Sequence, residues 1–106
     1  MDKFALLAFL HARPGKEEEV EEFLKSAQAL AESEEETTTW YAAKLGRSRY
    51  AIFDTFQTAE GRLAHVTGPI AKALFARAEE LFDPVPQVDM LDILAAKAPE
   101  TVRELA

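Results

Sequence analysis

The sequence contains no cysteine, and this absence excludes a disulfide framework and thiolate chemistry. No uninterrupted apolar run approaches the length that a membrane span requires, so we expect no association with a membrane. The first residues, Met1 to Leu10, lack the basic start and the small-residue cleavage site of a signal peptide. The absence of these export features predicts a cytoplasmic protein.

Basic residues are too few to form a positive stripe, because 12 lysines and arginines stand against 19 acidic residues, which gives a net charge of −7. We therefore do not expect a nucleic acid as a partner. The surplus of acid lies between Lys16 and Glu36, where nine glutamates accompany two lysines. The simplest interpretation is a solvated helix face that keeps the protein in solution, and an acidic docking surface is the alternative.

Internal repeats and linkers are also absent, and a length of 106 residues suits one compact domain. The hydrophobic fraction of 48% is ordinary for a globular protein and too high for a disordered one. We predict a single domain over residues 1–106, with a core over about residues 4–96 and a short polar C-terminal tail.

The spacing of apolar residues predicts seven elements. Short apolar and β-branched runs favour strands over residues 4–12, 37–45, 50–56 and 88–96. Apolar residues three and four positions apart favour helices over residues 16–35, 58–66 and 69–82, with Thr58 as an N-cap and Pro69 as a first helical residue. The order β-α-β-β-α-β predicts an α+β fold of the ferredoxin-like class, which is a four-stranded antiparallel sheet with helices on one side.

The strands lack the alternation of apolar and polar residues that a sheet covered on one face should show. The first strand is apolar on both faces, with Phe4, Leu6, Ala8 and Leu10 opposite Ala5, Leu7 and Phe9. Leaving several such side chains in water would cost on the order of 1.5–3 kcal/mol each, and the chain has no spare segment to cover them. We therefore predict an obligate homodimer in which two sheets close a β-barrel with an apolar interior.

The segment from Tyr50 to His65 carries an acidic residue, one spacer, an aromatic residue, a helix cap and a histidine near the helix end. These residues are Asp54, Phe56, Thr58 and His65. Upstream, the first strand runs into a Pro-Gly-Lys-Glu helix start at residues 14–17, and the second strand carries Trp40-Tyr41. In these features the sequence over residues 4–96 resembles the antibiotic biosynthesis monooxygenase family of dimeric α/β-barrel proteins.

This resemblance implies a dimeric α/β barrel and a choice of activities. The family includes cofactor-free quinol and anthrone monooxygenases, a signal-molecule isomerase and haem-degrading enzymes. The haem-degrading branch has an asparagine in the first strand, a tryptophan near the position of His65 and a histidine farther along. This chain has no asparagine, and Phe75 stands about where that histidine should be. We therefore do not expect haem degradation, and the resemblance to the cofactor-free members implies a protein without a cofactor.

His65 and Asp54 are the candidate catalytic residues. A neutral imidazole with a pKa near its usual value can take a proton from a phenolic substrate at neutral pH. Asp54 interrupts an apolar strand face, and a buried carboxylate needs a partner, for which His65, Arg47, Arg49 and Arg62 are available. The structural alternative is a histidine that packs at a helix end and an aspartate in a salt bridge. An Asp54 that orients His65 would satisfy both interpretations.

Five residues are candidates for substrate binding: Trp40, Tyr50, Phe56, His11 and Phe9. Aromatic side chains on strands can line a cavity for an aromatic ligand, and their alternative role is ordinary core packing. His11 has a structural alternative as well, because it shares its strand face with apolar residues. With two histidines and no tight carboxylate cluster, the sequence predicts no metal site.

These residues favour a cofactor-independent monooxygenase that acts on a small apolar or aromatic ligand such as a quinol or an anthrone. In this hypothesis the apolar barrel pocket desolvates the substrate, and His65 accepts its proton. One alternative is an isomerase or another proton-transfer enzyme in the same pocket. The other is a non-catalytic dimeric module that binds a small molecule, because fold alone does not determine function.

Overall fold

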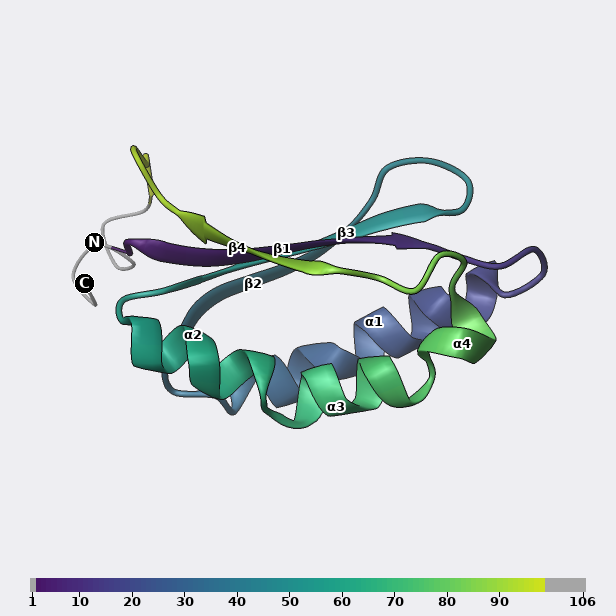
Figure 1. The fold of residues 1–106 in the computed structure, drawn as a ribbon, viewed down its shortest axis with the longest axis horizontal. Coiled ribbons are helices and arrows are strands. Elements are labelled where there is room, and N and C mark those ends of the chain that lie inside the picture. Colours follow the sequence, from purple (N-terminus) through teal and green to yellow (C-terminus); the bar gives the residue numbers. More distant parts are fainter. Residues whose placement is uncertain (1, 99–106) are drawn as a thin grey trace.

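The computed structural model describes residues 2–98, which form one sheet with every helix on the same side of it (Figure 1). The elements are β1 (Phe4–His11), α1 (Glu17–Glu32), β2 (Thr37–Lys44), β3 (Arg49–Phe56), α2 (Ala59–Val66), α3 (Pro69–Ala76), α4 (Ala78–Leu81) and β4 (Val88–Asp92). The strands lie in the order β2-β3-β1-β4, and each neighbouring pair is antiparallel. The predicted α+β ferredoxin-like fold is therefore confirmed.

Two helix starts follow directly from their local sequence. The Thr58 hydroxyl accepts a hydrogen bond from the Gly61 N–H at 3.0 Å, which satisfies one of the unpaired donors at the start of α2. Pro69 is the first residue of α3, where its missing N–H costs no helical hydrogen bond. Both helix starts agree with the sequence prediction, and together they place His65 in the last turn of α2.

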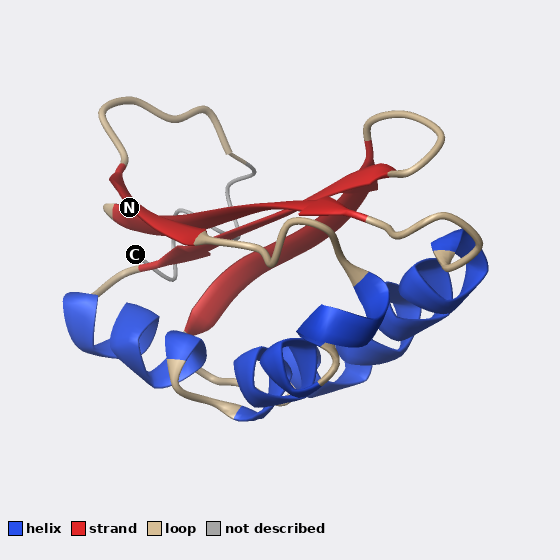
Figure 2. Cartoon of the chain, turned by 45° about the vertical axis from the view of Figure 1, so that its right-hand side comes forward, coloured by secondary structure: helices blue, strands red, loops and turns tan. Residues whose placement is uncertain are grey.

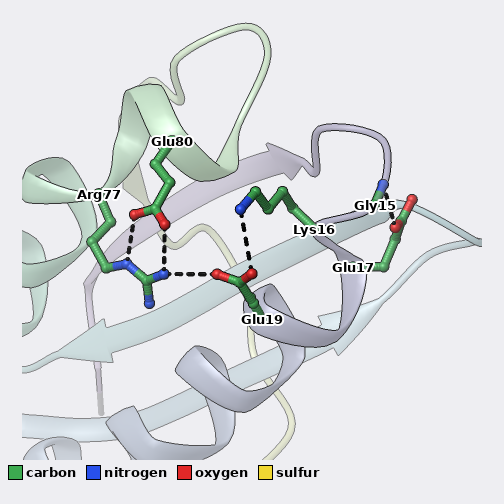
Figure 3. A network of polar contacts seen from close by, with 6 residues as sticks. All are labelled: Gly15, Lys16, Glu17, Glu19, Arg77 and Glu80. Carbon is green, nitrogen blue, oxygen red and sulfur yellow. Dashed lines mark hydrogen bonds and ion pairs between the residues drawn. The ribbon is translucent and has the colours of Figure 1, made fainter.

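Two predicted boundaries are wrong. The helix predicted over 69–82 divides at Arg77, whose backbone leaves helical geometry at φ −108° and ψ 7°. Its guanidinium donates hydrogen bonds to Glu80 and to Glu19 of α1, as Figure 3 shows. The strand predicted over 88–96 ends at Asp92, which is paired with Phe4, the first residue of β1. The predicted polar tail, residues 99–106, lies outside the described residues.

Figure 2 shows the helices as a layer beneath one face of the sheet. The core cluster contains buried side chains from both layers. Alternate side chains of β1 and β3 point into it, and α1, α3 and α4 supply the opposing apolar surface. The largest fully buried apolar side chains are Tyr50, Phe56, Phe82, Leu10, Leu81 and Val20. This layer also contains Asp54 and His65, which are 1% and 7% exposed.

The opposite face of the sheet carries no helix among residues 2–98, and several of its apolar side chains are exposed, although Ala5 and Thr55 on this face are buried. The register aligns Leu7, Phe53 and Tyr41 across β1, β3 and β2 on this face. Leu7 and Phe53 are half-buried, and Tyr41 and Phe9 are 60% and 51% exposed. The two-sided apolar pattern predicted from the sequence is therefore present, and pairing with a second copy stays a prediction. None of the helices within residues 2–98 combines the length and apolar character that a membrane crossing requires.

Candidate functional site

Asp54 and His65 are in contact in the layer between the sheet and the helices. Asp54 lies on β3, directly opposite Leu6 of β1 and Trp40 of β2 in the register, and its side chain points toward the helices. His65 reaches it from the last turn of α2, and 2.8 Å separates His65 Nε2 from Asp54 Oδ2. The ring of Phe56 packs against the imidazole at 5.4 Å between centroids. The sheet and α2 thus bring together the two residues that the sequence nominates as catalytic.

The second nitrogen of His65 contacts a residue that the sequence analysis missed. Glu34, in the turn after α1, places Oε1 2.5 Å from His65 Nδ1, and the Thr37 hydroxyl donates to the same oxygen at 2.9 Å. The Glu34 side chain is only 18% exposed, so the interpretation of the acidic segment as a solvated face is wrong for this glutamate. We refer to Asp54, His65 and Glu34 as the triad.

The arginines considered as partners of Asp54 lie elsewhere. Arg47 and Arg49 are exposed. Arg62 donates to the Leu91 carbonyl oxygen at 3.0 Å, and its guanidinium lies over the Phe4 ring. Within residues 2–98, the ionic partner of Asp54 is therefore His65.

The hydrogen-bond partners of His65 assign its charge. A protonated imidazole carries two N–H donors, and here both ring nitrogens face carboxylate oxygens. Burial opposes the charged ring, but the hydrogen bonds and negative charges of Asp54 and Glu34 outweigh it and raise the pKa of His65. A protonated ring can donate to both carboxylates, whereas a neutral ring can donate to only one of them. The geometry and the raised pKa therefore favour an imidazolium over the neutral ring that the sequence hypothesis uses.

Asp54 keeps one oxygen free of this arrangement. Its Oδ1 atom is buried and has no hydrogen-bond partner within residues 2–98, and the same holds for the indole Nε1 of Trp40. Burial raises the pKa of Asp54, and this effect exceeds the opposing influence of His65. An unpaired buried polar group costs about 1–3 kcal/mol. Such groups are therefore rare, and two of them on directly opposed residues need an explanation.

These two atoms belong to residues that line one small cavity of about 30 Å³. Apart from Asp54 and His65, the wall consists of apolar and aromatic side chains from the sheet and from α2 and α3; they include Leu6, Trp40, Ile52, Ile70, Leu74 and Phe75. Phe75, which is 44% exposed, also lines the cavity. The site is thus an almost wholly apolar recess beside a buried carboxylate that His65 holds in place.

The predicted substrate-binding residues do not share one chamber. Trp40 and Phe56 lie beside the triad, but the Tyr50 hydroxyl donates to Glu21 Oε2 at 2.7 Å in a different part of the core. Burial and this hydrogen bond raise the pKa of Tyr50 to about 12, which keeps its phenol neutral. Phe9 and His11 alternate with the core residue Leu10, so they lie on the other face of the sheet.

This separation corrects the barrel-pocket hypothesis. The triad lies between the sheet and the helices of one chain, and a barrel closed by a second sheet would enclose the opposite face. Asp54 and Glu34 contact opposite nitrogens of His65, so the three side chains do not converge on one point. Among residues 2–98, no group of three or more histidine, aspartate or glutamate side chains is arranged to hold a metal ion.

Comparison with solved structures gives a relative at substantial sequence identity. The chain is 44% identical to NE2512, a protein of unknown function from Nitrosomonas europaea, over 93% of this chain and 96% of that one, with a TM-score of 0.89. The chain belongs to the NE2512 family. No model of a known protein family matches the chain, and no curated protein matches its sequence.

More distant solved structures share the fold of the NE2512 family. A candidate antibiotic biosynthesis monooxygenase from Nitrosomonas europaea matches with a TM-score of 0.76 at 10% identity, over 87% of this chain and 99% of that one. Another, from Chloroflexus aurantiacus, matches with a TM-score of 0.68 at 14% identity, over 90% and 96%. At these identities the similarity establishes the fold alone.

Proposed function

We propose that this protein is a cofactor-independent monooxygenase that removes a proton from a small, electron-rich aromatic substrate, such as a quinol or an anthrone. The proposal places the chain in the antibiotic biosynthesis monooxygenase family, which it resembles in sequence. The observation that carries it is the unpaired and fully buried Oδ1 atom of Asp54, a residue that lines an apolar cavity and is held in place by His65. A carboxylate kept out of water is a stronger base than one in solution.

The geometry gives the two catalytic candidates different roles. Both nitrogens of His65 are occupied by carboxylates, so the imidazolium has no free site at which to accept a proton. Asp54 Oδ1 is unoccupied and is therefore the general base. His65 orients Asp54 through Oδ2, and its positive charge stabilises the carboxylate before the proton arrives.

The oxidation balances without an external reductant. For an anthrone, removal of one proton leaves an electron-rich carbanion that reacts with dioxygen at the same carbon and forms a hydroperoxide. Loss of water then gives a ketone, so the CH₂ group becomes C=O and the second oxygen atom leaves as water with the two hydrogens. Asp54 takes up the first proton and returns it to the departing oxygen.

The small volume of the cavity limits what enters it. Pockets that enclose a drug-sized ligand have volumes of about 300–1,000 Å³, whereas this cavity of about 30 Å³ accommodates a single functional group. In our proposal the reacting group enters the cavity and the aromatic ring lies at its mouth, against Phe75. The helices that cover the site are short and separate at Gly68 and Arg77, so α3 can move without unwinding a long helix.

Oxygen uptake tests this function directly. We expect the purified protein, without added flavin or metal, to consume one dioxygen per molecule of a quinol or anthrone from a panel, with one labelled atom from ¹⁸O₂ in the product. His65→Ala should lower the rate strongly, because Asp54 loses its orienting partner, whereas Leu63→Ala on the exposed side of α2 should not. No turnover across the panel, or full turnover in His65→Ala, would contradict the proposal.

Two other functions make different predictions. An isomerase or other proton-transfer enzyme would use the same base but turn over its substrate without oxygen. A non-catalytic binding module would bind aromatic compounds without converting them.

We also propose that the protein is a homodimer joined through the apolar face of the sheet. The exposed and half-buried side chains Leu7, Phe9, Tyr41 and Phe53 support this assembly, because they form one apolar surface on the side without helices. A single domain over residues 1–106, a cytoplasmic location and independence of cofactors remain predictions from the sequence.

A further inference from the structure

A second pocket, with a volume of about 400 Å³, lies at the end of the sheet where β1 finishes and β3 begins. Phe9 and His11 line it from β1, and their side chains point away from the helices. Residues 84–87, between α4 and β4, line it as well. Pockets that hold small ligands have volumes of about 300–1,000 Å³. This pocket is therefore large enough for a whole ligand, unlike the cavity beside the triad.

The segment between α4 and β4 is fastened beside the end of β1. The Asp83 N–H donates to the His11 carbonyl oxygen at 3.0 Å, and an isolated β-bridge joins Ala12 to Phe82. Figure 1 shows this segment returning from the helix layer to the sheet. It contains two prolines, at positions 84 and 86, whose backbone φ angle is fixed. This side of the pocket is therefore already in place before a ligand binds.

His11 and Arg49 supply the polar part of the pocket. They are directly opposed in the register of β1 and β3. The next pair, Ala12 and Ser48, carries a backbone hydrogen bond, so His11 and Arg49 form a non-hydrogen-bonded pair, in which opposed side chains lie closest together. Both residues line the pocket and both are exposed. A ligand can therefore reach the guanidinium and the imidazole at the same time.

The charge of this region suits one carboxylate. The arginine ion pairs within residues 2–98 are formed by arginines other than Arg49. Residues 44–49 contain three basic residues and no acidic one, in a chain with a net charge of −7. A guanidinium binds a carboxylate through two parallel hydrogen bonds. Asp89 of β4 also lines the pocket, and its negative charge disfavours a phosphate dianion.

We propose that this pocket binds a small monocarboxylate with an apolar or aromatic body. The carboxylate lies against Arg49 and His11. The body of the ligand lies against Phe9 and Val85, which are 51% and 49% exposed. Phe9 also belongs to the face that we propose as the dimer surface, so the pocket adjoins that surface. The triad lies on the other side of the sheet, so this site does not depend on the proposed monooxygenase activity.

The chain contains two histidines, one in this pocket and one in the triad, so NMR can observe the two sites separately. We expect titration of the wild-type protein with 2-naphthoate to shift the ring signals of His11 until they saturate, and to leave those of His65 in place. The matched probe 2-naphthamide has nearly the same shape and no charge. It should bind at least about tenfold more weakly, because hydrogen bonds between charged groups are lost.

Substitutions at Arg49 test the same contact from the side of the protein. Arg49→Gln removes the guanidinium at an exposed position and should weaken the binding of 2-naphthoate about tenfold or more. Arg49→Lys keeps the charge but not the planar fork, so it should recover only part of the affinity. The control is Arg47→Gln, which removes one positive charge outside the pocket lining and should bind 2-naphthoate as the wild type does.

The outcomes separate this site from the proposed function. Equal binding of the two probes, or full binding in Arg49→Gln, would overturn carboxylate recognition. The absence of a saturable shift at His11, or a shift confined to His65, would overturn the placement of the site. Saturable binding at His11 in a protein that consumes oxygen with no substrate would support this site and contradict the monooxygenase.

Discussion

Replacing Asp54 with asparagine is expected to lower kcat for a quinol or anthrone substrate by about 10²–10⁴-fold, the usual contribution of a general base. Asparagine has nearly the same shape, and its carbonyl oxygen can still accept from His65 Nε2, so the fold should persist. What the variant loses is the basic oxygen beside the cavity. Steady-state oxygen uptake measures the effect, and a circular dichroism spectrum verifies the fold.

The dependence of this reaction on pH follows from the state of Asp54. The base must be ionised, so turnover is present above the pKa of Asp54 and is lost as the pH falls through it. Burial raises this pKa above the usual value near 3.8, so the loss should occur at a higher pH than for an exposed aspartate. The residual activity of Asp54→Asn should lack this acidic limb. The control is Asp92→Asn, which makes the same change at an exposed position and should leave kcat unchanged. An unchanged kcat in Asp54→Asn would exclude Asp54 as the base.

Introducing a charge at Phe53 is expected to convert the dimer into monomers. Phe53 lies between Leu7 of β1 and Tyr41 of β2 on the apolar face of the sheet. Burial of a phenylalanine in the interface contributes about 1.5–3 kcal/mol to association. Because a two-fold axis relates the two chains, the substitution removes this contribution from both copies. An unpaired aspartate in a dry interface adds a desolvation cost of several kcal/mol. We therefore expect Phe53→Asp to abolish association at micromolar concentration.

Sedimentation velocity checks this expectation. The wild-type protein should sediment at twice the chain mass of 11.8 kDa, and Phe53→Asp should sediment at 11.8 kDa. Leu63→Asp makes a similar change on the exposed surface of α2 and should remain a dimer. A wild-type protein that is monomeric at micromolar concentration would contradict the dimer. It would leave the triad intact, because one chain supplies all three residues of the triad.

The fold could be predicted from the sequence because its signals are local. Thr58, Pro69 and the apolar spacing in residues 16–35 each act within a few positions, and each helix they predict is present. The end of β4 could not be predicted in this way. Residues after Asp92 continue the apolar pattern, but the register with β1 ends at the pair Phe4–Asp92, and the Ile93 N–H still donates to the Lys3 carbonyl oxygen at 2.9 Å. Strand length here depends on a neighbour that is far away in the sequence.

The candidate site was predictable in part for the same reason. Asp54 stands out because it interrupts an apolar strand face, and His65 stands out because the family pattern has a histidine near the helix end. The sequence could not show which residues of β1 lie on the same sheet face as Asp54, because β1 is apolar on both faces. The pairing of Leu6 with Asp54 decides it, and it places Phe9 and His11 on the other face. Glu34 had no distinguishing signal, because only the tertiary contact separates it from its acidic neighbours.

The account depends on the charge of His65 within the triad. If Asp54 and Glu34 hold an imidazolium, the free base is Asp54 Oδ1; if the ring is neutral, the roles of the two residues must be exchanged. The decisive measurement is a pH titration of the His65 ring by ¹H–¹⁵N NMR in the wild-type protein. We expect both ring nitrogens to carry hydrogen at pH 7 and the pKa of His65 to lie above its usual value of about 6.5. A ring with one N–H at pH 7 and a pKa at or below 6.5 would contradict the account.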